Sequence, residues 1–150
     1  MSFQKGSFDC SLFLFHYHRR CILENIRTHF NIDQALCGKP QLIENGESCI
    51  TFTALPEMAA DKSGLVHGGF VFGLADYAAM LAVNHPNVVL GSADVKFLNP
   101  VQVGDTLEAR ASIQKVDGKK QIVDVVISKR DKKVFTGRFT CFVLDTHVLD

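Results

Sequence analysis

The sequence predicts an α+β domain in which an antiparallel sheet wraps around one long buried helix. Three observations lead to this fold class. Residues 70–83 are apolar apart from Asp76, as in a helix that is buried on all sides. Four later segments alternate apolar and polar residues, which is typical of half-buried strands. Tight turns join most of these segments, and tight turns permit only antiparallel pairing.

The length of the chain favours a single domain. A chain of 150 residues is long enough to bury a sizeable core. Residues 1–20 show no clear periodicity, and we interpret them as a poorly determined leader that precedes one domain at 21–150. No apolar stretch reaches the roughly 20 residues that span a bilayer, so no membrane association is expected.

The charge and the cysteine content indicate which class of partner and which cellular compartment to expect. The formal net charge is zero, which argues against a protein held to nucleic acid by its general field. The five cysteines are odd in number and scattered, and no two are spaced as CxxC. This usage favours a reduced, cytoplasmic setting.

The first predicted element is a short helix at 21–35. Ile22, Ile26 and Phe30 recur at intervals of four and form one apolar stripe. The glycine and proline at 38–40 should end this helix.

A strand with an internal turn is predicted at 41–55. The turn is expected at Asn45-Gly46, and one face of the strand carries Ser48, Ile50, Phe52 and Ala54. The apolar helix comes next. It should end near Pro86, because proline disfavours helical geometry at the residue before it.

Strands make up the rest of the expected fold. Alternation predicts them at 91–100, 105–116, 121–130 and 135–144. Turns are expected at 117–118 and at 131–133.

The start of the apolar helix has the composition of a ligand site. Gly68 and Gly69 carry no side chain, so a ligand can approach their backbone closely. The first N–H groups of a helix lack internal partners and lie at the positive end of its dipole. They suit a carbonyl oxygen that becomes negative during a reaction, as in an oxyanion hole. The alternative is that the two glycines only ease the entry from loop to helix.

Asp76 is the single charge in the apolar run, and an unpaired buried carboxylate costs several kcal/mol. It lies roughly 12 Å from Gly68 along the helix, at about 1.5 Å per residue. A reacting atom must lie about 3 Å from both the nucleophile and the oxyanion donors. If the two residues cooperate, two antiparallel helices must share each site, which predicts a two-fold dimer. The alternative is a structural acid that pairs with a buried base or caps a loop.

The run at 66–76, in which six residues separate His67-Gly68-Gly69 from Asp76, resembles the signature of hotdog-fold acyl-CoA thioesterases of the PaaI-like (phenylacetic-acid-pathway) family. The resemblance covers about residues 35–145 and implies hydrolysis of a thioester to a carboxylic acid and free coenzyme A. It implies that the Gly68 N–H polarises the thioester carbonyl and that Asp76 is the nucleophile or the general base. It also implies that His67 orients the thioester or its sulfur.

The resemblance implies two substrate-binding residues, Gly69 and Asp61. Relatives often carry Asn or Gln at the position of Asp61, and Ser or Thr where this chain has Ala79 and Met80. No metal is implied, and no cofactor beyond the coenzyme A of the substrate. The expected assembly is a homodimer or a tetramer. The alternative function is a non-catalytic acyl-CoA-binding or regulatory hotdog module, but such a module need not keep Asp76.

Two further groups of residues have weaker functional interpretations. His16, His18 and Cys21 are metal-ligand types at close spacing but lack a fourth ligand. The basic segments 119–120 and 130–133 are expected to be solvated turns, with contact to the phosphates of coenzyme A as the alternative.

Overall fold

The protein is described here by a computed structural model that places residues 25–150. The leader predicted at 1–20 and the candidate metal ligands His16, His18 and Cys21 lie outside these residues. The elements, in chain order, are α2 (Gln34–Cys37), β1 (Lys39–Glu44), β2 (Glu47–Thr53), the 3-10 turn η2 (Pro56–Met58), α3 (Gly68–Val83), β3 (Val88–Phe97), β4 (Thr106–Asp117), β5 (Lys120–Lys129) and β6 (Lys132–Val143).

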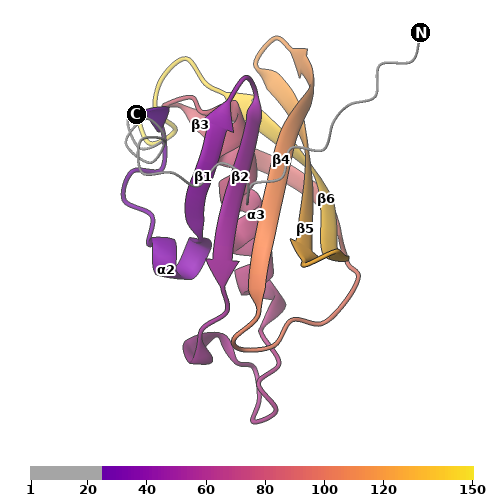
Figure 1. Ribbon diagram of the computed structural model, residues 1–150. Coiled ribbons are helices and arrows are strands. Elements are labelled where there is room, and N and C mark those ends of the chain that lie inside the picture. The colour runs from indigo at the N-terminus through magenta and orange to yellow at the C-terminus, as the bar shows by residue number, and fades with distance from the viewer. Residues whose placement is uncertain (1–24) are drawn as a thin grey trace, which may run out of the picture.

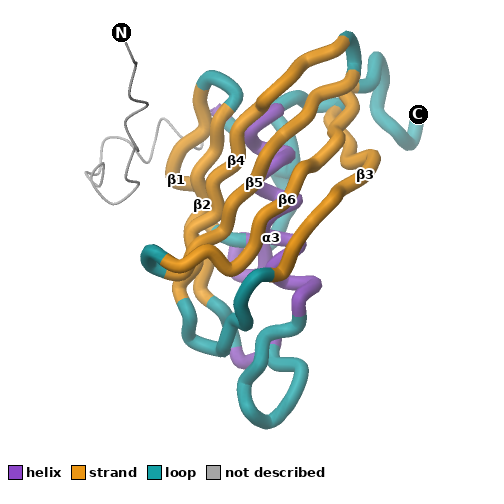
Figure 2. Tube along the Cα trace, turned by 90° about the vertical axis from the view of Figure 1, so that its right-hand side faces the viewer, coloured by secondary structure: helices purple, strands orange, loops and turns teal. Residues whose placement is uncertain are grey.

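One six-stranded sheet forms the framework, in the order β1-β2-β4-β5-β6-β3. Every neighbouring pair is antiparallel. The long helix α3 lies along one face of this sheet, and the strands curve past it (Figures 1 and 2). The predicted α+β architecture, with one long helix against an antiparallel sheet, is therefore confirmed.

Helix α3 is the centre of the core. Most of its side chains are buried, including Leu74, Ala78 and Leu81, which have no exposed surface. Alanines along the helix let its backbone approach the sheet closely. The buried Ser48 of β2 uses this closeness, because its hydroxyl donates a hydrogen bond of 2.7 Å to the carbonyl of Ala78. The helix ends where Asn84 adopts the left-handed conformation, two residues before Pro86.

The predicted turns are correct in place, with small shifts. Asn45 and Gly46 both have positive φ, at 51° and 77°, as a two-residue hairpin turn of type I′ requires. The turn between β4 and β5 is formed by Gly118 and Lys119, one residue later than predicted. The turn between β5 and β6 is at residues 130–131 instead of 131–133.

The helix predicted at 21–35 is wrong for most of the part that the structure describes. Asn25 is helical, residues 26–33 are not, and the chain then forms the single turn α2. His29 has a φ of 55°, which breaks a right-handed helix. The backbone of this stretch is instead bound to the end of α3, where the Asn84 side chain bonds the N–H of Arg27 and the carbonyl of Asn25. Tertiary contacts thus override an apolar periodicity of four.

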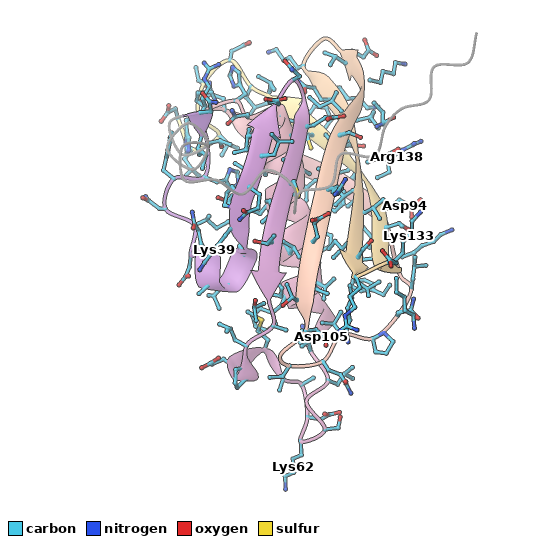
Figure 3. The ribbon with its side chains drawn as sticks, in the orientation of Figure 1. Lys39, Lys62, Asp94, Asp105, Lys133 and Arg138 are labelled. Carbon is cyan, nitrogen blue, oxygen red and sulfur yellow. The ribbon has the colours of Figure 1, made fainter. Side chains whose placement is uncertain are left out.

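The face of the sheet away from α3 is polar. Asp94 and Arg138 are Cα partners on β3 and β6, and both side chains project from this face (Figure 3). The guanidinium of Arg138 donates two hydrogen bonds to Asp124 on β5, of 2.7 and 2.9 Å. Among the residues placed, no helix has both the length and the apolar character needed to cross a membrane.

Candidate functional site

The first turn of α3 is organised by His67. This residue is the N-cap of the helix, and its Nδ1 accepts a hydrogen bond of 2.8 Å from the N–H of Gly69. Because Nδ1 accepts, the neutral ring carries its proton on Nε2, and the ring is exposed. The predicted residues His67 and Gly69 are therefore brought together, with the Gly69 N–H already occupied.

The backbone N–H of Gly68 is the hydrogen-bond donor that stays free at the helix start. Its N–H has no acceptor within residues 25–150, as expected for the first N–H of a helix. A Cβ at this position would lie 3.2 Å from the ring of Phe97. The absence of a side chain thus lets β3 pack tightly against the helix start. The free N–H also lies at the positive end of the helix dipole, where a negative oxygen is stabilised.

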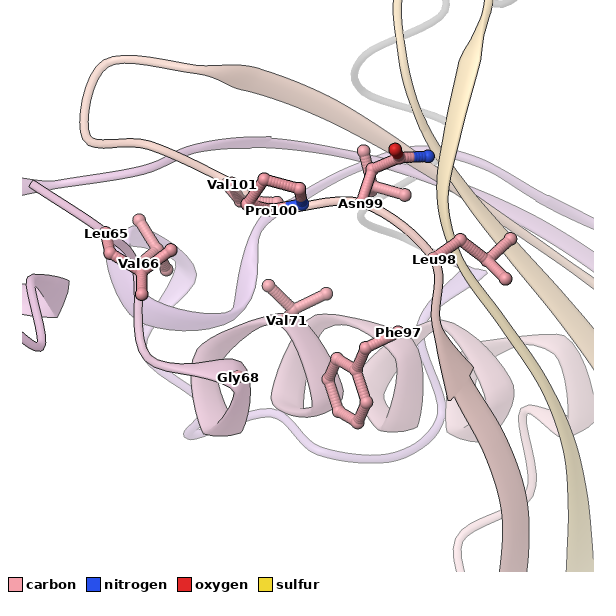
Figure 4. A pocket seen from close by; sticks show the side chains of 10 residues that line it. Leu65, Val66, Gly68, Val71, Phe97, Leu98, Asn99, Pro100 and Val101 are labelled. Atoms are coloured by element: carbon pink, nitrogen blue, oxygen red, sulfur yellow. The ribbon is translucent and has the colours of Figure 1, made fainter.

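A cavity of about 350 Å³ opens beside Gly68 (Figure 4). The ring of Phe97 forms one side of it and packs edge-on against Phe135, with centroids 5.1 Å apart. The remaining lining is mostly apolar and comprises Leu65, Val66, Val71, Leu98, Asn99, Pro100, Val101 and Val134. The cavity suits an apolar chain that passes the helix start.

Asp76 lies two turns further along α3 and is largely buried. Its Oδ1 is inaccessible and has no hydrogen-bond partner within the described chain. Burial raises the pKa of this carboxyl to about 6. The ion pairs found among residues 25–150 do not include Asp76. The structural-acid alternative, a pairing with a buried base, therefore finds no support in the part of the chain that is placed.

Two thiols lie near the Asp76 carboxyl. Burial, together with the charge of Asp76, raises the pKa of Cys141 on β6 to about 12. Burial and the charges of Asp33 and Asp76 also raise the pKa of Cys37. Neither thiol is therefore ionised near neutral pH, and both are weak donors beside the acid.

One side of α3 is left uncovered in the turn before Asp76. A Cβ at Gly73, one turn before Asp76, would meet no atom within 4 Å. Strand β3 borders this side and is exposed along most of its length, with Phe97 56% accessible. Gly68 and Asp76 thus share an open flank of the molecule, but the helix spacing of roughly 12 Å keeps them apart within one chain.

Asp61 lies on the loop before α3 and is exposed. Its carboxylate accepts hydrogen bonds from the N–H and the hydroxyl of Ser63, at 2.8 and 2.6 Å, and a longer one from the N–H of Leu65. These bonds, the Ser63 hydroxyl first, lower the pKa of Asp61. Asp61 therefore shapes the loop that brings Leu65 to the cavity. Its predicted contact with substrate stays a prediction.

The sequence interpretation missed two residues of this region. The predicted strand 91–100 includes Phe97, but the sequence does not indicate that this residue lies at the site. The reason is that all of α3 separates Phe97 from Gly68 in the chain. Gln121 pairs with Cys141 and faces α3, and its buried Oε1 has no partner in the described residues. Gln121 lies on the same face of β5 as the buried Val123 and Val125. A polar residue on an otherwise apolar face is the sequence signal that indicates it.

No metal-binding cluster is present within residues 25–150, since no three His, Cys, Asp or Glu side chains lie close enough together to hold an ion. The structure thus offers two chemical groups on α3. One is a free N–H at the positive end of the helix, and the other is a carboxyl whose pKa burial raises to about 6.

Comparison with solved structures supports the same fold. An uncharacterised protein from Pyrococcus horikoshii is 53% identical, with a TM-score of 0.82, and the match covers 83% of this chain and 96% of that one. The PaaI protein of the phenylacetic acid degradation operon of E. coli is 26% identical, with a TM-score of 0.69, and the match covers 76% of this chain and 84% of that one.

Curated relatives include a regulator. Transcription factor FapR of Thermoanaerobacter sp. is 33% identical over 98 residues, which make up 65% of this chain and 49% of that protein. The chain spans 27% of the length of one curated relative that it matches and 49% of the length of FapR. Residues 63–136, which include all of α3, match the profile of the thioesterase superfamily. The chain therefore belongs to the thioesterase superfamily, as a PaaI-like protein of the hotdog fold.

Proposed function

We propose that this protein hydrolyses an acyl-CoA thioester to a carboxylic acid and free coenzyme A. The observation that carries the proposal is the pair of unsatisfied groups on α3. The N–H of Gly68 has no acceptor within the described chain, and the buried Oδ1 of Asp76 has no donor there. The first suits the carbonyl oxygen of a thioester, and the second suits an attack on its carbon.

Each site is shared between two copies of the chain. Strand β3 pairs with β6 on one side, and its other edge has no partner strand among the residues placed. An open edge of this kind is a template for antiparallel pairing. Pairing of β3 with β3 about a two-fold axis sets the two α3 helices side by side in opposite directions. Gly68 of one subunit then faces Asp76 of the partner subunit across the uncovered flank.

The chemistry follows from these placements. The Gly68 N–H polarises the thioester carbonyl and stabilises the oxyanion that forms. The carboxylate of Asp76 either takes a proton from an attacking water or attacks the carbonyl itself, in which case water cleaves the resulting anhydride. In both routes the C–S bond breaks and coenzyme A leaves as a thiolate that is protonated. A pKa of about 6 leaves most of this carboxyl ionised at pH 7.

The remaining residues of the site orient the substrate. His67 holds its ring over the first turn and directs Nε2–H towards the sulfur or the carbonyl of the thioester. Gly69 fixes that ring through its N–H and leaves space for the substrate. Asp61 supports the loop that carries Leu65 to the cavity.

A non-catalytic acyl-CoA-binding or regulatory module is the second candidate function. The similarity to FapR favours it, because that relative is a transcription factor. Asp76 argues for the enzyme, since a binding module gains nothing from an unpaired buried acid. The two functions differ in turnover, because only the enzyme releases thiol from an acyl-CoA.

Thiol release from a panel of short, long and aromatic acyl-CoAs tests the proposal. Asp76→Asn is expected to lower kcat on the order of 10²-fold or more. Glu47→Gln removes an exposed acid on β2 and serves as the matched control, with an unchanged rate. A near-normal rate in Asp76→Asn contradicts the mechanism. Binding of coenzyme A without turnover supports the module instead. Light scattering tests the shared site separately, since a monomer at micromolar concentration contradicts it.

A further inference from the structure

Two buried side-chain oxygens lack a hydrogen-bond partner within residues 25–150. They are Oδ1 of Asp76 on α3 and Oε1 of Gln121 on β5. Buried polar groups are paired as a rule, so each exception needs an explanation. The proposed reaction accounts for Asp76 but leaves the inward amide of Gln121 without a role.

Asp76 comes opposite Cys141 of β6. Phe72, one turn before Asp76 on the same side of α3, packs against Phe139 with ring centroids 5.7 Å apart. Cys141 is two residues after Phe139 and therefore on the same face of β6. The charge of Asp76 also contributes to the raised pKa of the Cys141 thiol, which independently indicates that the two side chains lie close together.

Gln121 lies in the same row of the sheet as Cys141. The two residues are Cα partners on β5 and β6. Side chains directly opposite each other in an antiparallel pair point to one face, with their Cβ atoms about 4.5–5.5 Å apart. Cys141 is fully buried, whereas Val116, the partner of Gln121 on β4, is 60% exposed. The inaccessible amide oxygen therefore lies on the Cys141 side, so the thiol is next to both unpaired oxygens.

A side-chain amide suits an ionised carboxyl as a partner. It carries an NH₂ donor beside its oxygen, and a half-turn about the last bond of the side chain exchanges the two groups. With Nε2 inward, Gln121 donates to Oδ1 of Asp76, and neither inward atom is left unpaired. The thiols of Cys141 and Cys37, the titratable groups on which the charge of Asp76 acts within residues 25–150, are weaker donors.

We propose that Gln121 is a positioning residue, whose side-chain amide donates a hydrogen bond to the inward Oδ1 of Asp76. This bond fixes the carboxylate with Oδ2 towards the open flank of α3, where the thioester lies. The role of Asp76 in this proposal rests on the proposed function, and the choice of Gln121 rests on the structure. Burial still holds the pKa of Asp76 above its ordinary value, because one hydrogen bond offsets only part of the desolvation.

The test replaces the amide without changing its shape. Gln121→Met removes the donor, and Gln121→Glu exchanges it for a second acid. A donor stabilises the ionised form of Asp76, so the inflection of kcat/KM against pH should move up by about one pH unit in Gln121→Met. It should move further in Gln121→Glu, because two neighbouring carboxylates repel each other. We expect kcat at the plateau to fall about tenfold, with KM unchanged. A purely structural role would leave the inflection in place.

Gln114→Leu is the matched control, because Gln114 is an exposed glutamine of β4. It should change neither the inflection nor the rate. An unchanged inflection in Gln121→Met, or an equal shift in the control, overturns the assignment. If Gln121→Met does not fold, the isosteric Gln121→Glu decides in the same way.

A titration by carbon-13 NMR separates this assignment from the proposed function. It follows the side-chain carboxyl carbon of Asp76, whose signal is identified by its loss in Asp76→Asn, and needs no turnover. If the wild-type protein hydrolyses no thioester, the proposed activity fails, but the titration still tests Gln121. A higher pKa of Asp76 in Gln121→Met than in wild type supports the hydrogen bond, and equal values in the two folded proteins overturn it.

Discussion

The two reactive positions on α3 are built in opposite ways. At Gly68 the donor is a backbone N–H that every helix leaves unpaired at its start. At Asp76 a charged side chain is placed in a buried turn, where its Oδ1 finds no partner among residues 25–150. The unpaired N–H of Gly68 costs the fold little stability. Burial of Asp76, in contrast, raises the pKa of its carboxyl to about 6. A helix start can thus be reactive by geometry alone, but a mid-helix acid opposes folding and implies a function.

Removal of the Gly68 donor should have the largest effect on activity. Gly68→Pro deletes the N–H, and proline suits the first position of a helix. The extended backbone of His67, with φ −61° and ψ 131°, is compatible with a proline after it. We expect kcat to fall about 10²–10³-fold, as for other lost oxyanion donors. Gly68→Ala introduces the same Cβ beside Phe97 but keeps the N–H, so it should retain most of the activity.

Equal losses in Gly68→Pro and Gly68→Ala would mean that the side chain, not the N–H, causes the effect. The proline variant also tests the sharing of sites. When it is mixed and refolded with Asp76→Asn, half of the dimers are mixed and each of these has one intact site. The mixture should regain about a quarter of the wild-type rate. No recovery in a mixture that forms mixed dimers contradicts a site built from two chains.

Replacement of Asp76 should raise the stability of the protein although it lowers the activity. A folded-state pKa above the ordinary value means that the folded protein binds the proton more tightly, so stability falls as pH rises through about 6. Asp76→Asn should therefore be more stable than wild type at pH 7, by about 2–3 kcal/mol for a shift of about two pKa units. Near pH 3 the difference should nearly vanish, because the carboxyl is then protonated in the folded state and, with an ordinary pKa of 3.8, mostly protonated in the unfolded state.

Urea unfolding at pH 3 and pH 7, at equal protein concentrations, measures this difference. A variant that is less stable than wild type at pH 7 would show that Asp76 has a stabilising partner. It would then resemble an ordinary structural acid, and the contrast with Gly68 would be lost.

The pH dependence of the rate should show the smallest effect. If the ionised carboxylate of Asp76 acts, kcat/KM should rise with pH to a plateau above about 7, with an apparent pKa near 6. At pH 5 the rate should be about tenfold below the plateau. Activity that falls as pH rises through 6 would contradict this role. Residual hydrolysis by Asp76→Asn should lack the inflection, whereas Glu47→Gln should keep it.

Much of this molecule could be predicted from local patterns. The alternation of apolar and polar residues placed a strand at 121–130, within one residue of β5, and Asn45-Gly46 marked the turn of the first hairpin. Both signals work because they depend on neighbours within a few residues. The segment 21–35 shows the limit. Its apolar period of four resembled a helix, but contacts with Asn84 hold the described part of it in another conformation.

The candidate site divides in the same way. His67, Gly68 and Asp76 were identified from the sequence, because glycines before an apolar run and an isolated acid within it are visible without a fold. The contact of Phe97 with Gly68 and the inward position of Gln121 were missed. Both depend on which strands lie against α3, and that follows from the order β5-β6-β3 in the sheet.

By itself, the sequence determined the fold class, the buried helix and the spacing of roughly 12 Å that separates Gly68 from Asp76. Helical geometry fixes this spacing whatever surrounds the helix. Only the tertiary structure decided which groups lack partners, which flank of α3 is open, and which residue of β5 lies beside Cys141. These features depend on contacts between segments far apart in the chain, because burial and pairing are properties of the packed molecule and not of a local pattern.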